Sequence, residues 1–300
     1  MSALPTTGEL FATNQVSPET ERGYKYQLRN FAQWMSDSRD VHNMEDVTTA
    51  DLLAYKQSLA RLAPATQKRY LATLKSFFAW AAEAGIIPAD PAVGVKLPKA
   101  IQGKAPTYCT TTETRALLRS VPPGRYAKRD LAMLWCFAHG LRVAEVAALD
   151  VRDVTAPTGD GLAALRVRGK GRKVRTVPLG REAYRATRAY LRERGQAGGR
   201  DALLVCSYGG RTKRMSRRGI QERFSVLATM AGLPPDKRHP HAMRHGFGTR
   251  MLFESNAPGG IYTVSKLLGH SRVSTTEVYL HCSQRRLEQA MLADPLGAGV

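Results

Sequence analysis

The sequence lacks the features that mark several large classes of protein. Its four cysteines, Cys109, Cys136, Cys206 and Cys282, lie far apart and form no C-x-x-C pair, so we expect neither a zinc ribbon nor a disulfide framework. No apolar run approaches the length of a membrane span, and no charged start precedes an apolar stretch as in a secretory leader. We therefore expect a cytoplasmic protein with reduced thiols and no membrane partner.

Acidic residues are scarce, and the resulting charge imbalance is confined to one part of the chain. The sequence contains 45 Lys and Arg against 25 Asp and Glu, a formal net charge of +20. Residues 1–100 contain 11 basic and 10 acidic residues, so nearly all of the excess lies in residues 101–300. Solubility alone rarely requires so large a net charge, so this part predicts a polyanionic partner.

Length and composition predict a globular chain of two domains. The hydrophobic content of 43% excludes a disordered or fibrous chain, and 300 residues exceed the roughly 250 at which a single core stops growing. Residues 1–17 are polar and unpatterned, which predicts a flexible lead-in. We expect an all-α bundle over residues 18–95, a proline-rich linker over 96–106, a second domain over 107–292 and a tail over 293–300.

Helical spacing in the first domain places basic residues on an exposed surface. Three helices are expected to begin near Pro18, Thr49 and Pro64, the third ending at Gly85. This third helix carries Lys68, Arg69 and Lys75. They are candidates for DNA contact, although charged helix faces are often only solvated.

The second domain is predicted to be mainly α-helical with a small β-sheet. Leu162–Arg168 and Val174–Leu179 alternate between apolar and polar residues on either side of a glycine-flanked Lys170, which predicts a β-hairpin. Helices are expected over Thr114–Arg119, Asp130–His139, Glu182–Arg194, Ser216–Ala231, His241–Phe253, Val264–Leu268 and Ser274–Tyr279.

Two arginines are placed where they could bind a phosphate. Arg142 and Glu145 are three residues apart, which on a helix puts them on one face, with the carboxylate orienting the guanidinium. A weak surface ion pair is the alternative. His241 and Arg244 follow Pro240, a residue that suits the first turn of a helix, and helix N-termini bind anions.

Other polar residues have ordinary alternatives when each is taken alone. His239, His241 and His245 could suggest a metal site, but no carboxylate or cysteine accompanies them in the sequence. Lys170 could be an exposed turn residue, and Tyr279 a half-buried aromatic. The functional interpretation rests on the whole set, because arginines, histidines and a tyrosine together can perform phosphodiester chemistry without a metal.

Four short motifs occur in the order found in a known enzyme family. They are Gly140-Leu-Arg142-x-x-Glu145, Gly169-Lys170-Gly171 followed by Val177-Pro178-Leu179, His241-x-x-Arg244-His245, and Leu-Gly-His270 with Tyr279 nine residues later. With them the chain resembles a tyrosine recombinase of the phage-integrase superfamily, closest in layout to the short Xer-type recombinases. The resemblance implies a tyrosine-recombinase catalytic domain over residues 107–292 and a helical core-binding (SAM-like) DNA-binding domain over 18–95.

The resemblance also implies a role for each motif residue. The catalytic residues are Arg142, Lys170, His241, Arg244, His270 and the nucleophile Tyr279, with Glu145 and His245 as active-site support. Tyr279 forms a 3′-phosphotyrosyl bond, Lys170 protonates the leaving 5′-oxygen, and the arginines stabilise the phosphorane. No metal, cofactor or ATP is implied. The implied partner is double-stranded DNA, with a homo-tetramer on two recombination sites, alone or with a related recombinase subunit, on the nucleoid.

Two other functions use part of the same set. A type IB topoisomerase relaxes supercoils with similar groups, and a DNA-binding regulator could retain an idle site. The separate helical domain and the Leu-Gly-His270 motif favour recombination over relaxation. The presence of all six catalytic groups favours an enzyme over a regulator.

Overall fold

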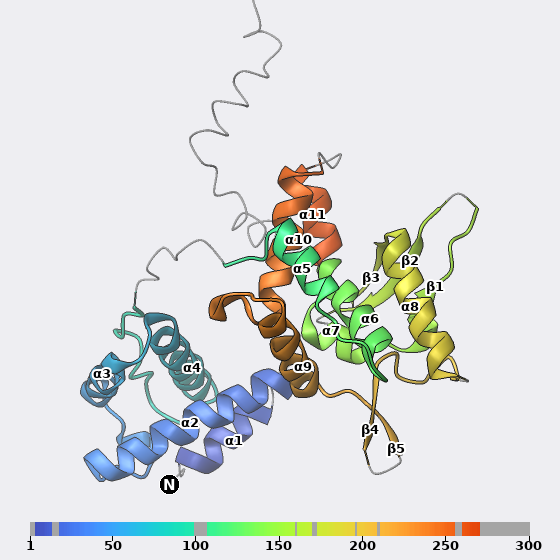
Figure 1. Cartoon of the computed structure of the whole chain (residues 1–300). Coiled ribbons are helices and arrows are strands. Elements are labelled where there is room, and N and C mark those ends of the chain that lie inside the picture. The colour runs from blue at the N-terminus through green and yellow to red at the C-terminus, as the bar shows by residue number, and fades with distance from the viewer. Residues whose placement is uncertain are drawn as a thin grey trace, which may run out of the picture. The chain divides into compact units, whose positions relative to one another are not determined.

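The computed structural model forms two compact units, Met1–Gly103 and Lys104–Val300 (Figure 1). The division lies inside the 96–106 segment, where proline spacing predicted a linker. The structure describes residues 4–13, 18–98, 107–159, 161–169, 173–195, 197–208, 211–255 and 260–270. The prediction of a mainly helical chain with small sheets is confirmed.

Among the described residues of the first unit, all elements of regular secondary structure are helices. This unit contains α1 (Leu4–Thr13), α2 (Pro18–Arg39), α3 (Thr49–Ser58) and α4 (Pro64–Glu83), with short 3₁₀ helices at Met44–Asp46 and Leu59–Arg61. Thr48 and Asp51 form a reciprocal capping box that starts α3, and Pro64 occupies the first turn of α4. Beyond α4, Gly85 takes a φ of +68°, a conformation that favours glycine.

Aromatic side chains form the core of the first unit. Phe31, Phe77 and Phe78 are completely buried, and the rings of Phe31 and Phe78 meet edge to face at 6.0 Å. The expected flexible lead-in over residues 1–17 is wrong for α1. Phe11 is 5% exposed and stacks on Tyr24 at 5.4 Å, so burial of this ring holds the short helix against the bundle.

The second unit combines seven helices of more than one turn with two small antiparallel sheets in its described residues. The helices are α5 (Thr111–Arg119), α6 (Ala127–Ala138), α7 (Val143–Ala148), α8 (Arg181–Arg194), α9 (Arg217–Met230), α10 (Pro240–Phe253) and α11 (Gly260–Leu268), with 3₁₀ helices at Val151–Asp153 and Pro235–Lys237. The strands are β1 (Val154–Thr155), β2 (Ala163–Arg168), β3 (Val174–Leu179), β4 (Val205–Tyr208) and β5 (Arg211–Arg214).

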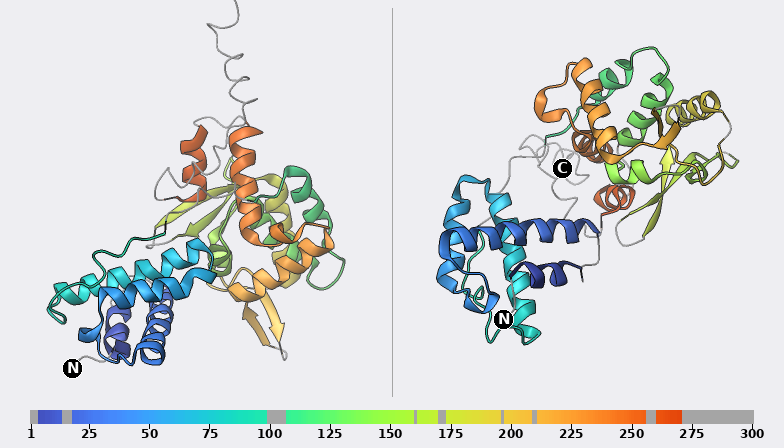
Figure 2. Two further views of the ribbon diagram at one scale, coloured as in Figure 1. Left: turned by 90° about the vertical axis from the view of Figure 1, so that its left-hand side faces the viewer. Right: turned by 90° about the horizontal axis from the view of Figure 1, so that it is seen from below.

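The predicted hairpin forms the centre of a three-stranded sheet in the order β1-β2-β3. Its register pairs Val167 with Arg175 and Arg168 with Val174. A second hairpin, β4–β5, was missed by the sequence analysis and projects away from the helices (Figures 1 and 2). All four residues of β5 are exposed, so the alternation that reveals a half-buried strand is absent.

The core of the second unit gathers around α6. Met133, Leu134 and Phe137 are completely buried, and Phe137 meets Phe224 of α9 edge to face at 5.5 Å. A smaller cluster joins α10 to α11, which lie side by side (Figure 2). Among the described residues, no helix is both long and apolar enough to cross a membrane.

Candidate active site

Arg142 stands at the start of α7, after a turn that only glycine accommodates. Gly140 takes a φ of +79°, and a Cβ there would lie 2.6 Å from the Phe247 ring. Arg142 is the N-cap, with extended backbone, and its N–H donates to Glu145 Oε2 at 2.8 Å. The expectation that Arg142 and Glu145 share a helical face is therefore wrong. Glu145 caps the helix and holds Arg142 just outside it.

The buried Glu145 carboxylate is surrounded by three arginines. Arg142 Nη1 donates to Oε1 at 3.0 Å. Arg175 of β3 binds both oxygens, with Nη1 at 2.8 Å and Nη2 at 2.9 Å. Arg244 Nη1 lies 3.9 Å from Oε2, within ion-pair distance. The carboxylate side chain is only 4% exposed, so these contacts are poorly screened by water.

Arg244 comes from α10, whose start is capped by a histidine. The N–H of Ala242 donates to His239 Nδ1 at 3.2 Å, and His239 Nε2 lies 3.0 Å from the carbonyl of Asp236. Both ring nitrogens of His239 thus serve the helix start. One turn on, Arg244 donates to the carbonyls of Gly140 and Leu268, the latter at 2.8 Å. His241 and His245 follow on α10, with ring centroids 6.3 Å apart.

The C-terminus of α11 brings His270 to the arginines. Gly269 takes a φ of +66°, and the N–H groups of Gly269 and His270 donate to the carbonyls of Lys266 and Ser265, which closes the helix in a Schellman motif. The next two carbonyls accept from side chains. Leu267 accepts from Arg175 Nε at 2.9 Å, and Leu268 accepts from Arg142 Nη1 at 3.3 Å as well as from Arg244.

All four carbonyls that a helix leaves unpaired at its C-terminus are therefore satisfied here, two by backbone and two by arginines. Positive charge is also favoured at this end of a helix by the macrodipole. The arrangement fixes three guanidinium groups around the turn that carries His270.

Charge and burial set the protonation of the site. Burial alone would raise the pKa of Glu145, but hydrogen bonds from Arg175 and the Arg142 backbone outweigh burial and lower it. Burial and the charges of Arg244, Arg142 and Arg175 lower the pKa of His270 to about 4. Burial and His241 likewise lower that of His245 to about 4. Near neutral pH these two histidines are uncharged and can donate hydrogen bonds without adding charge.

The structure brings together five predicted site residues that lie far apart in the sequence. Arg142 caps α7 and Glu145 lies in its first turn, Arg244 belongs to α10, and His270 follows α11. His241 of α10 lies near Arg244, whose charge, together with burial as the larger cause, lowers the pKa of this histidine. Lys170 and Tyr279 lie outside the described residues, so their placement stays a prediction.

The three DNA-contact candidates on α4 separate into two groups. Lys68 and Arg69 are exposed. Lys75 instead donates through Nζ to the carbonyls of Ala92, Val93 and Val95, at 2.5, 3.2 and 3.1 Å. Its ammonium group thereby anchors the segment that follows α4, which argues against a role in DNA contact.

Arg175 was missed by the sequence analysis, although a signal was present. In β3, Val177 and Leu179 point into the core, and a strand repeats its faces every two residues. Arg175 therefore occupies the same face as these buried residues. A charged residue at an inward position predicts a buried partner, which here is Glu145.

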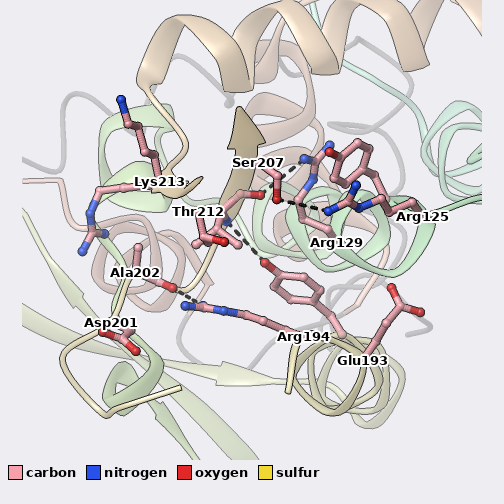
Figure 3. A pocket seen from close by; sticks show the side chains of 13 residues that line it. Arg125, Arg129, Glu193, Arg194, Asp201, Ala202, Ser207, Thr212 and Lys213 are labelled. Carbon is pink, nitrogen blue, oxygen red and sulfur yellow. Dashed lines mark hydrogen bonds between the residues drawn. The ribbon is translucent and has the colours of Figure 1, made fainter. Parts of the chain in front are cut away.

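A cavity of about 730 Å³ lies elsewhere in the second unit, and no predicted site residue lines it (Figure 3). Its cations include Arg129, Arg194 and Arg214. Arg129 is paired with Asp130, Arg214 with Asp150, and Arg194 with the carbonyls of Ala202 and Leu203. The charges of these three arginines are used within the protein, so they do not indicate a substrate site.

Comparisons with known proteins agree with the geometry. Residues 108–286 match the phage integrase family, and residues 7–85 match the phage integrase N-terminal SAM-like domain. The chain is 33% identical over 279 residues to the tyrosine recombinase XerC of Serratia marcescens, covering 91% of this chain and 87% of that protein. It is also 33% identical over 280 residues to XerC of Escherichia coli O139:H28, covering 93% and 90%.

Solved structures show the same fold. A XerH site-specific recombinase bound to a palindromic difH substrate has a TM-score of 0.75 at 20% identity, covering 96% of this chain and 84% of that chain. The Tn1549 transposon integrase in complex with circular intermediate DNA has a TM-score of 0.73 at 18% identity, covering 97% and 99%. The chain therefore belongs to the phage integrase family and is a tyrosine recombinase, an enzyme of site-specific DNA cleavage and rejoining.

Proposed function

We propose that Arg142 and Arg244 bind the scissile phosphate of duplex DNA, with His270 and His241 as hydrogen-bond donors beside them. The observation that carries this proposal is the convergence of both guanidinium groups on the Leu268 carbonyl, two residues before His270. Two fixed arginines can bind the nonbridging oxygens of one phosphate, and their charge opposes the charge that develops on the phosphorane.

The way in which both arginines are held supports this proposal. The contacts of Arg142 with Glu145 and Leu268 use Nη1, and its side chain is 35% exposed. A guanidinium has five N–H donors, so those on Nε and Nη2 can face a ligand. Arg244 is only 4% exposed and is fixed by its two carbonyl partners. Binding energy is thus not consumed in ordering either side chain.

In the proposed reaction Tyr279 is the nucleophile and Lys170 the general acid. The Tyr279 hydroxyl transfers its proton to the neutral His241 as its oxygen forms a bond to phosphorus. The bond to the 5′-oxygen breaks at the same time, and Lys170 supplies the proton for that oxygen; both proton transfers reverse when the strand is rejoined. A 5′-hydroxyl from a second strand then attacks the phosphotyrosyl bond and restores the phosphodiester. One phosphoester bond replaces another at each step, so neither ATP nor a metal ion is required.

A nicked suicide substrate tests the assignment of the nucleophile. Wild-type protein should form a covalent DNA adduct that survives denaturing electrophoresis, also in the presence of EDTA. Tyr279→Phe should bind the same duplex and form none. An adduct in Tyr279→Phe would overturn the assignment, and an EDTA-sensitive reaction would overturn the metal-free mechanism. Arg142→Ala should bind DNA and lose cleavage by roughly 10²–10³-fold or more.

We further propose that the active assembly is a homo-tetramer on two recombination sites in the nucleoid, alone or with a related recombinase subunit. Strand exchange supports this stoichiometry, because two duplexes with two cleaved strands each need four tyrosine nucleophiles. The basic excess of residues 101–300 supports a duplex partner at each subunit.

A further inference from the structure

Arg175 links the segments of the candidate site more directly than any other described residue outside the predicted set. It extends from β3 and is largely buried, with 14% of its side chain exposed. Its Nη atoms bind the two oxygens of Glu145, and its Nε donates to the Leu267 carbonyl at 2.9 Å. One planar group therefore joins the cap of α7 to the end of α11.

Each of these partners positions another residue of the site. Glu145 holds the backbone and side chain of Arg142, at 2.8 and 3.0 Å. Leu267 lies three residues before His270 and next to Leu268, whose carbonyl accepts from Arg142 and Arg244. The bidentate contact also fixes the plane of the carboxylate, which a single hydrogen bond would leave free to rotate.

We propose that Arg175 is a positioning residue for DNA cleavage, setting Arg142 through Glu145 and the His270 turn through Leu267. The proposal rests on the phosphate-binding role proposed for Arg142 and Arg244. As a positioning residue, Arg175 does not contact the DNA itself. It keeps the guanidinium of Arg142 and the turn that bears His270 in one fixed arrangement before DNA binds.

Gly269 supports the proposal independently. A Cβ at this position would lie 2.8 Å from Arg175 Nη1 and 3.0 Å from its Cζ. The guanidinium thus packs directly against the backbone that precedes His270. The glycine of the Leu-Gly-His270 motif is required both by its positive φ and by the approach of Arg175.

Variants of Arg175 test the proposal, with Arg166 as the matched control. Arg166 lies on the neighbouring strand β2 and pairs with Asp153 at 3.2 Å, outside the candidate site. Arg175→Gln should leave duplex binding near wild type and slow adduct formation by about 10²-fold, the typical effect of a misplacement of about 1 Å. Arg166→Gln should cleave at the wild-type rate. Cleavage by Arg175→Gln within about threefold of wild type would overturn the proposal.

Arg175→Lys separates geometry from charge. Lysine keeps the positive charge but cannot bind both oxygens of Glu145 while donating to Leu267. We expect Arg175→Lys to remain folded and to cleave nearly as slowly as Arg175→Gln. Restoration of the wild-type rate by lysine would show that charge alone is needed and would overturn the positioning role. This variant also decides the question if Arg175→Gln does not fold.

A double-mutant cycle tests whether Arg175 acts through Glu145. The double variant Glu145→Gln/Arg175→Gln should cleave about as slowly as the slower single variant, because both changes disturb the same support of Arg142. If the fold-reductions in rate of the two single variants multiply in the double variant, Arg175 acts independently of Glu145, which would contradict the proposal.

A measurement that does not depend on DNA cleavage tests the positioning role of Arg175 separately from the proposed function. An NMR titration should show a higher His270 pKa in Arg175→Gln than in wild type, because one of the cations that lower it is gone. Arg166→Gln should leave it unchanged. An unchanged His270 titration in Arg175→Gln would count against the inference, whether or not the wild type forms its adduct. Loss of the Tyr279 adduct in wild type would count against the proposed function alone.

Discussion

At the scale of single residues, Glu145 allows three arginines to share one small volume. Arg142, Arg175 and Arg244 all approach its carboxylate, which leaves two positive charges in excess. A phosphodiester carries one negative charge, and a second develops on the phosphorane. With the proposed phosphate bound, the site would therefore be closer to electrical neutrality in the transition state than in the ground state, as transition-state stabilisation requires.

The histidines of the site should make stability depend on pH. Folding lowers the pKa values of His245 and His270 from 6.5 to about 4, so the unfolded chain takes up protons first. The stability that this contributes is complete above pH 6.5 and is lost as the pH falls toward 4. The melting temperature should fall between pH values of about 7.5 and 5, and it should fall less for His245→Gln/His270→Gln than for wild type. An equal fall in melting temperature for both proteins would mean that these histidines do not cause the pH dependence of stability.

Two glycines at helix ends form a matched pair for a second prediction. Gly232 after α9 and Gly269 after α11 take φ values of +73° and +66°, but only Gly269 is approached by a side chain, that of Arg175. Alanine at either position should cost about 1–2 kcal/mol in backbone strain. Gly269→Ala should also displace Arg175 and slow adduct formation more than tenfold, while Gly232→Ala should cleave normally. Equal rates in suicide-substrate assays would contradict the packing argument.

At the scale of elements, the sequence predicted what local chemistry determines. Thr110 and Glu113 form the capping box expected before α5, and Gly140 ends α6 with positive φ. The β4–β5 hairpin was missed because β5 is exposed along its whole length and the described side chains of β4 are half-buried, so neither strand shows an alternation of buried and exposed residues. The meeting of Arg142 with Arg244 could not be derived from spacing. It depends on the packing of α7, α10 and α11. The first of these helices begins at Val143 and the last ends at Leu268, more than a hundred residues later.

The two faces of α4 give a third prediction, again with a matched control. Lys75→Met leaves three carbonyls without their donor, so it should destabilise the first unit by about 1–3 kcal/mol. It should not alter the salt dependence of DNA binding. Lys68→Met on the exposed face should reduce the slope of log K against log salt by about one and leave the melting temperature nearly unchanged. The reverse pattern would support Lys75 as a DNA contact.

At the scale of the whole molecule, charge and chemistry are located in the same unit. The second unit contains the arginine cluster, and residues 101–300 contain nearly all of the net charge of +20. A long-range field of this sign attracts duplex DNA before any specific contact forms. The first unit, close to neutral, matches the SAM-like domain and contributes far less to this attraction.

The last prediction concerns the segment after Tyr279, the proposed nucleophile, which lies outside the described residues. In the sequence, Leu287, Ala290 and Met291 fall on one side of a short helical pattern that begins near Ser283. So short a helix gains little stability unless its apolar side is buried, and docking on a neighbouring subunit would close four subunits into a ring. Truncation after Ser283 should therefore preserve binding to a single site and abolish four-subunit synapses in native gels with two-site DNA. Leu287→Asp should have the same effect, whereas Gln289→Asp, on the opposite side, should assemble normally. Synapses formed by the truncated protein would instead make the segment a cap on its own domain.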